Sequence, residues 1–285
     1  MNNAFVPHNP LMEGADPFIL TYNNKYYLYF TKEEDGFKVY ESTDLVSWTD
    51  KGYCLRRGNQ IYGDKGFWAP EIIYHNNLFY MVYVANEYLA IAKSKSPLGP
   101  FVQEEIKPLD EEKMIDGHFF KDDDGTIYLY FVRFNNENII HGAKMNKDMK
   151  SFDKSSERFL LKAELPWETI TPYKVSEGPF VLKHNHKYYL SYSCNHTESP
   201  SYAIGYAVSE SPLGPYKKYE RNPILSKTDQ VVGVGHHSFF KRISDNHLMI
   251  VYHRHYSPTQ NYPRQVCLDE AEFKDDILKI KGPSF

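Results

Sequence analysis

One pattern of alternating apolar and polar positions recurs five times along the chain. In each copy, aromatic and branched side chains dominate a short stretch in which apolar and polar positions alternate. This alternation is typical of a β-strand with one buried face. The five stretches are residues 25–30, 78–83, 126–131, 187–192 and 247–252. A polar turn and a shorter apolar strand precede each stretch, which predicts a β-hairpin in every copy.

A third strand follows these hairpins, for example at residues 37–41, 89–92 and 203–207. Two of the third strands run into nearly identical turns, at 94–101 and 209–216, which predict a fourth, outer strand. Units of three to four antiparallel strands, repeated every roughly 50 to 60 residues, are typical of the blades of a β-propeller.

We therefore predict an all-β chain that forms a five-bladed β-propeller. The alternative is a β-sandwich with Greek-key connections, which the internal repeat disfavours. Strands around 266–268 and 277–280 should complete the fifth blade, and helix should be scarce. No linker interrupts the repeats, so residues 1–285 are expected to form a single catalytic domain.

Three acidic residues stand near the start of the first strand in three different blades. They are Asp16, Asp116 and Glu177, and the first strands of a propeller converge on its central channel. Any one of them alone is an ordinary loop or turn residue. Together they match glycoside hydrolysis, which needs two carboxyl groups with separated pKa values, and a third charge nearby helps to separate them. Glu71 is a weaker candidate, because it aligns with positions on the strand itself.

Short motifs at these places occur in a fixed order along the blades. They are Ala-Asp-Pro-Phe at 15–18, Trp-Ala-Pro-Glu at 68–71, Ile-Asp-Gly at 115–117, Ser-Glu-Gly-Pro at 176–179 and Gly-Val-Gly-His-His-Ser at 233–238. With them the chain resembles glycoside hydrolase family 43 over nearly its whole length. The related retaining families are disfavoured, because their Arg-Asp-Pro and Glu-Cys motifs are absent.

The resemblance implies an inverting mechanism in which Asp16 is the general base and Glu177 the general acid. Asp116 would raise the pKa of Glu177 and orient it. Inversion would separate the base and acid carboxyl groups by ~6.5–9.5 Å, which leaves room for a water molecule.

Further site residues follow from the same resemblance. Trp68 would help to wall the sugar pocket, with packing between blades as the alternative. His118 and His237 would line the pocket, and Arg264 would reach a substrate hydroxyl unless it is simply solvated. His236 matches a histidine that reaches a calcium ion in the channel, where water would supply most of the ligands because calcium prefers oxygen. The alternative is a buried, hydrogen-bonded histidine.

Composition narrows the functional class. The net charge of -4 offers no basic surface for nucleic acid, and no apolar run is long enough to span a membrane. Aromatic residues make up 16% of the chain, which fits both strands and sugar binding. The three widely spaced cysteines predict reduced thiols, and the N-terminus lacks the pattern of a signal peptide, so a cytoplasmic location is expected.

The predicted function is an exo-acting α-L-arabinofuranosidase that acts on arabinose-containing plant oligosaccharides, with a small carbohydrate as its substrate and with no nucleic acid or membrane as a partner. The alternatives are a β-xylosidase or an enzyme with both activities. A non-catalytic sugar-binding propeller is a further alternative, as is a protein-interaction propeller. Loops 52–66 and 160–175 are expected to shape the rim of the pocket.

Overall fold

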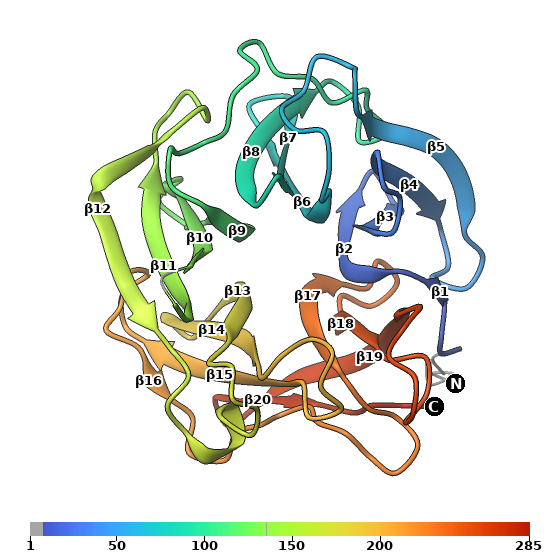
Figure 1. The fold of residues 1–285 in the computed structure, drawn as a ribbon, viewed down its shortest axis with the longest axis vertical. Coiled ribbons are helices and arrows are strands. Elements are labelled where there is room, and N and C mark those ends of the chain that lie inside the picture. The colour runs from blue at the N-terminus through green and yellow to red at the C-terminus, as the bar shows by residue number, and fades with distance from the viewer. Residues whose placement is uncertain (1–7, 135) are drawn as a thin grey trace.

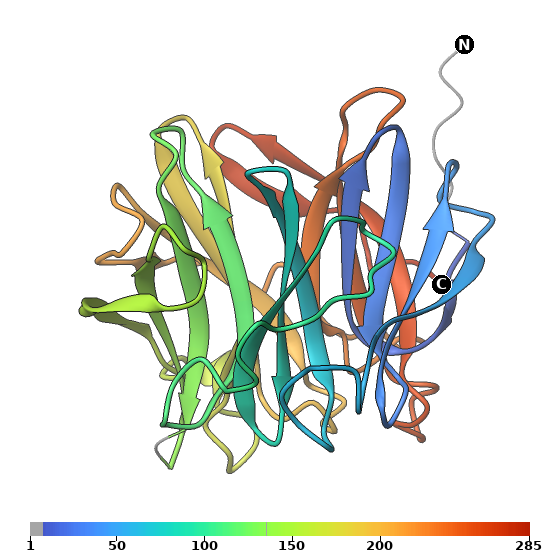
Figure 2. The ribbon, with the colours of Figure 1, turned by 90° about the horizontal axis from the view of Figure 1, so that it is seen from above.

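The computed structural model describes residues 8–134 and 136–285, which form five antiparallel sheets arranged in a ring (Figure 1). The predicted five-bladed β-propeller is therefore confirmed. Seen from the side, the strands run through the depth of the ring (Figure 2). Within the described residues the helical structure is the single 3₁₀ turn Pro166–Glu168, and no helix there is long and apolar enough to cross a membrane.

Each blade begins at the centre of the ring and proceeds outward in chain order, except that the N-terminal strand β1 joins the outside of the last blade. The first two blades contain β2 (Ala15–Tyr22), β3 (Lys25–Thr31), β4 (Gly36–Ser42) and β5 (Thr49–Arg56), then β6 (Trp68–His75), β7 (Leu78–Ala85) and β8 (Tyr88–Ser94). The next two contain β9 (Met114–Lys121), β10 (Ile127–Phe134), β11 (Asn138–Met145) and β12 (Phe152–Leu161), then β13 (Ser176–His184), β14 (Lys187–Cys194), β15 (Ala203–Ser209) and β16 (Lys217–Lys218). The last blade contains β17 (Gly235–Lys241), β18 (Leu248–Arg254), β19 (Gln265–Lys274) and β20 (Ile277–Ile280), together with β1 (Met12–Glu13).

The turns of the inner hairpins have the conformation that their polar dipeptides predict. Asn23 and Asn24 have φ values of 49° and 57°, and Asn76 and Asn77 have values of 49° and 63°. Two consecutive positive φ values define the hairpin turn whose twist matches that of the flanking strands, and asparagine tolerates this conformation.

The outer strands differ from the prediction in the second blade. There the turn at 94–101 leads only to an isolated bridge between Lys93 and Val102, so this blade has three strands. Both repeated turns nevertheless have a shared structural role. Tyr29 of the first blade donates its hydroxyl hydrogen to the Pro97 carbonyl at 2.6 Å, and Tyr130 of the third blade does the same to Pro212 at 2.6 Å. The repeated turns therefore accept hydrogen bonds that join each of these blades to the next.

The N-terminal segment closes the ring, a feature that the sequence did not reveal. β1 pairs with β19 of the last blade, with Met12 opposite Val266. Just before β1, the Asn9 side chain accepts a hydrogen bond from the Leu268 N–H and donates one to its carbonyl, each at 2.8 Å. The beginning and end of the described chain thus lie in one blade.

The contribution of Asn9 to ring closure can be measured as a change in stability. Replacing Asn9 by alanine should lower the free energy of unfolding by about 1–3 kcal/mol, because both backbone groups of Leu268 lose their partner. Urea unfolding measures the change. The exposed Asn146→Ala should change it by less than about 0.5 kcal/mol. Equal values for the two variants would show that ring closure does not depend on Asn9.

Candidate active site

A β-bulge interrupts the inner strand of every blade near its start. At each bulge the pairing shifts and one residue adopts a positive φ. These residues are Asp16 (50°), Ala69 (46°), Asp116 (55°), Gly178 (55°) and His236 (43°). Bulges re-aim side chains, and left-handed residues other than glycine gather at functional sites. The bulges therefore direct residues from all five blades toward one end of the channel.

The bulge positions refine how the three acids correspond. Asp16 and Asp116 are themselves the left-handed residues of their bulges, whereas Glu177 comes one residue before its left-handed Gly178. Glu177 is thus offset by one position from the other two acids. Glu71 lies beyond its bulge and pairs with Val82, which confirms its placement on the strand.

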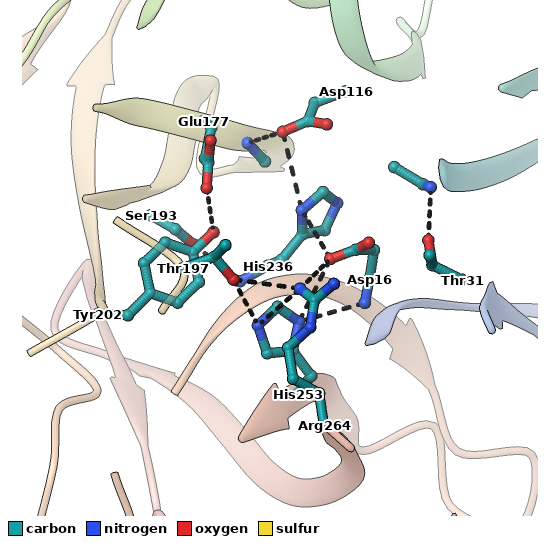
Figure 3. Close-up of polar contacts among 12 residues, drawn as sticks. Asp16, Thr31, Asp116, Glu177, Ser193, Thr197, Tyr202, His236, His253 and Arg264 are labelled. Carbon is teal, nitrogen blue, oxygen red and sulfur yellow. Dashed lines mark hydrogen bonds and ion pairs between the residues drawn. The ribbon is translucent and has the colours of Figure 1, made fainter. Parts of the chain in front are cut away.

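Asp16 lies at the centre of a group of nitrogen donors (Figure 3). Its Oδ1 is 3.1 Å from Nη1 of Arg264 and 3.4 Å from Nδ1 of His236. Burial raises the pKa of this carboxyl group, but Arg264 and the nearby histidines lower it by more, so the net pKa is well below the ordinary value. Asp16 is therefore held as a carboxylate.

Asp116 faces the same histidine from the other side. Its Oδ2 is 3.7 Å from His236 Nδ1 and accepts a hydrogen bond from the Gly178 N–H at 2.9 Å. Burial and the charge of Asp16 raise the pKa of Asp116, against the opposing effect of His236. The bond to Gly178 ties Asp116 to the residue that follows Glu177.

Glu177 has different surroundings from Asp16. The Tyr202 hydroxyl donates to its Oε1 at 2.8 Å, and the Asn138 amide donates to its Oε2 at 3.1 Å. Burial, reinforced by the negative charge of Asp116, raises the pKa of Glu177 to about 7. The site thus contains one carboxyl group held ionised and a second that takes up a proton near neutrality.

His236 lies between Asp16 and Asp116, and this position bears on the calcium prediction. Burial lowers the pKa of His236, but the two carboxylates raise it by more. Among the described residues, no group of three or more His, Cys, Asp or Glu side chains is placed to hold a metal ion. The side chains present do not form a calcium site by themselves. A calcium ion held mainly by water stays a prediction.

Arg264 and Trp68 lie where their predicted roles are possible. Arg264 is not simply solvated, because its Nη1 donates to both Asp16 and Thr197 at 3.1 Å. Trp68 is 39% exposed at the start of β6, so it is not buried between blades. Their contacts with sugar stay predictions.

His118 and His237 lie deeper in the channel. His118 is 3% exposed, and its ring nitrogens contact the Glu71 carboxylate at 2.7 Å and the Val181 N–H at 3.0 Å. His237 is 2% exposed, with Nε2 2.6 Å from the Ser191 hydroxyl. That either ring contacts sugar stays a prediction, and this burial argues against it because the rings are covered by protein.

Four residues at the site escaped the sequence analysis: Asn138, Thr197, Tyr202 and His253. His253 Nδ1 accepts the Asp16 N–H at 3.2 Å, and burial lowers the pKa of this ring to about 3, so it is neutral. Tyr202 stacks on His253, with ring centroids 5.6 Å apart. The sequence signal that could have revealed His253 is the register of the last inner hairpin, in which His253 pairs with Gly235 beside the bulge.

Comparison with known proteins agrees with this geometry. The family model described as glycosyl hydrolases family 43 matches residues 7–278. A crystal structure of an endo-1,4-β-xylanase from Bacteroides thetaiotaomicron is similar, with a TM-score of 0.91 and 40% identity over 97% of both chains. A β-D-galactofuranosidase from Aspergillus niger is 29% identical over 95% of this chain and 84% of its own.

A xylosidase/arabinosidase from Butyrivibrio fibrisolvens is 28% identical over 86% of this chain, which spans only 50% of that relative's length. The family match covers nearly the whole chain and includes every residue of the carboxylate site. The chain therefore belongs to glycosyl hydrolases family 43, and it is a glycosidase that hydrolyses O-glycosyl bonds.

Proposed function

We propose that this glycosidase is an inverting, exo-acting α-L-arabinofuranosidase that releases arabinose from plant oligosaccharides. The observation that carries the mechanism is the opposite behaviour of two carboxyl groups. The pKa of Asp16 is well below its ordinary value, while that of Glu177 is raised to about 7. Carboxyl groups whose pKa values are driven apart are the mark of an acid and base pair.

In this mechanism Asp16 accepts a proton from water as the water oxygen bonds to the anomeric carbon. Glu177 donates its proton to the glycosidic oxygen as the bond between that oxygen and the anomeric carbon breaks. The products are arabinose with inverted anomeric configuration and an alcohol, which is the rest of the oligosaccharide. Afterwards Asp16 loses a proton to solvent and Glu177 regains one.

Asp116 acts through Glu177 rather than on the sugar. Its negative charge raises the pKa of the acid, and its bond to the Gly178 N–H fixes the backbone next to the acid. Tyr202 and Asn138 each donate a hydrogen bond to one oxygen of Glu177, and they thereby orient its carboxyl group for proton donation.

The choice of sugar is supported by the relatives. α-L-Arabinofuranose and β-D-galactofuranose share the configuration of their furanose rings, and a galactofuranosidase is among the similar proteins. A relative named xylosidase/arabinosidase supports the alternative, a β-xylosidase or an enzyme with both activities.

The substrate is tested first with three p-nitrophenyl glycosides: α-L-arabinofuranoside, β-D-xyloside and β-D-galactofuranoside. We expect the arabinofuranoside to be hydrolysed with the highest kcat/KM, and NMR of early product to show the inverted anomer. A higher kcat/KM on the xyloside would select the alternative. Retained configuration would refute the water-activating role of Asp16.

The acid role is tested with Glu177→Gln on two leaving groups. Hydrolysis of an arabinose disaccharide should fall by about 10²- to 10⁴-fold, because its leaving oxygen needs protonation. The p-nitrophenyl glycoside should lose much less, because nitrophenolate leaves without a proton. Asp16→Asn serves as the comparison and should lose activity on both substrates. If Glu177→Gln also affected both substrates equally, Glu177 would not be the acid.

The pH dependence follows from the same groups. Glu177 must be protonated, so kcat/KM on the disaccharide should fall as the pH rises through about 7. Asp116→Asn removes a charge that raises the pKa of Glu177, so the basic limb should move to lower pH by roughly one unit. Asparagine can still accept the Gly178 N–H, which keeps the backbone contact. An unmoved basic limb would contradict the coupling.

A further inference from the structure

A cleft of about 510 Å³ opens beside the carboxylate site, between the third and fourth blades. Its wall is built by the end of β10, the segment before β13 and the turn after β14, and it includes Glu177. Neither Asp16 nor Asp116 is among the described residues that line it. The cleft therefore reaches the proposed acid but not the proposed base.

The position of the cleft beside Glu177 indicates which part of the substrate it can bind. In inverting hydrolysis the acid stands next to the leaving oxygen, and the base with its water stands on the opposite face of the sugar. Whatever is attached to the leaving oxygen must lie on the acid's side. Thr197 lines the near end of the cleft and accepts a hydrogen bond from Arg264, the partner of Asp16. Thr197 thus marks the border between the cleft and the surroundings of the base.

The cleft presents an aromatic face on a fixed segment. Tyr173 lines it, is 63% exposed, and packs against the His196 ring with centroids 5.4 Å apart. The neighbouring backbone is held in place, since the Asn138 N–H donates to the Lys174 carbonyl at 3.0 Å. An exposed tyrosine ring offers apolar contact to the C–H face of a sugar.

The charge of the cleft favours a neutral sugar. Lys174 is the only lysine or arginine among the described lining residues, and it is paired with Glu137 at 3.0 Å. A sugar carboxylate would have to compete with Glu137 for this ammonium group. A neutral ring needs no such exchange and meets hydrogen-bonding groups at Asn136 and His196.

We infer that this cleft is the leaving-group subsite and that it binds a neutral sugar ring stacked on Tyr173. The inference rests on the proposed role of Glu177 as the acid. It makes the substrate an oligosaccharide in which the released sugar is linked to a further neutral sugar, rather than to a small alcohol or a uronic acid.

The test compares a substrate that fills the cleft with one that does not. One is α-1,5-linked arabinotriose, and the other is α-L-arabinofuranosyl fluoride, whose leaving group is too small to reach Tyr173. Tyr173→Ala should lower kcat/KM on the trisaccharide by roughly 3- to 10-fold, through the lost stacking contact. Turnover of the fluoride should be unchanged.

Two control variants separate stacking from general damage. Tyr173→Phe keeps the ring and should behave as the wild type on both substrates. Phe159→Ala removes a ring that is 55% exposed on β12, outside the cleft, and should also change neither rate. No loss in Tyr173→Ala, or an equal loss on both substrates, would overturn the subsite while leaving the proposed function intact. Absence of turnover of both substrates by the wild type would overturn the proposed arabinofuranosidase itself.

Discussion

In four of the five blades the backbone N–H of the left-handed bulge residue donates to an acceptor outside its own strand ladder, as a buried N–H requires. In most blades that acceptor comes from the preceding blade. Thr31 accepts the Ala69 N–H at 2.9 Å, and Ser193 accepts the His236 N–H at 2.9 Å. His253 and Asp116 do the same for Asp16 and Gly178 (Figure 3). The bulges that aim the site are thus held by the contacts between blades.

The chemistry of the site follows from this arrangement. Bulge residues from the first, third and fifth blades bring Asp16, Asp116 and His236 together, and the offset of Glu177 places it against Tyr202 instead. Burial raises the pKa of both groups, but cations stand beside Asp16, whereas the negative charge of Asp116 acts on Glu177. The pKa values of Asp16 and Glu177 are therefore shifted in opposite directions within one site.

Such a site requires that the ring stay closed. Asp16 and Arg264 are 248 residues apart in sequence and meet where the first blade lies beside the last blade, to which β1 adds a strand. The Tyr29 and Tyr130 hydrogen bonds to the repeated turns join further blades in the same way. Many aromatic side chains among the described residues are buried in the cores, whereas others, such as Trp68 and Tyr173, are exposed and accessible to a ligand.

The sequence by itself determined the repeat, the strand order and the three acids, because alternation and turn residues are local properties that recur in every blade. It did not reveal the three-stranded second blade or the closing strand, since both depend on pairing between distant segments. It also missed Asn138, Thr197, Tyr202 and His253, which stand in no shared motif. The resemblance named Glu177 as the acid, but only the tertiary structure shows the physical reason, because a pKa depends on burial and on neighbouring charges that the fold brings together.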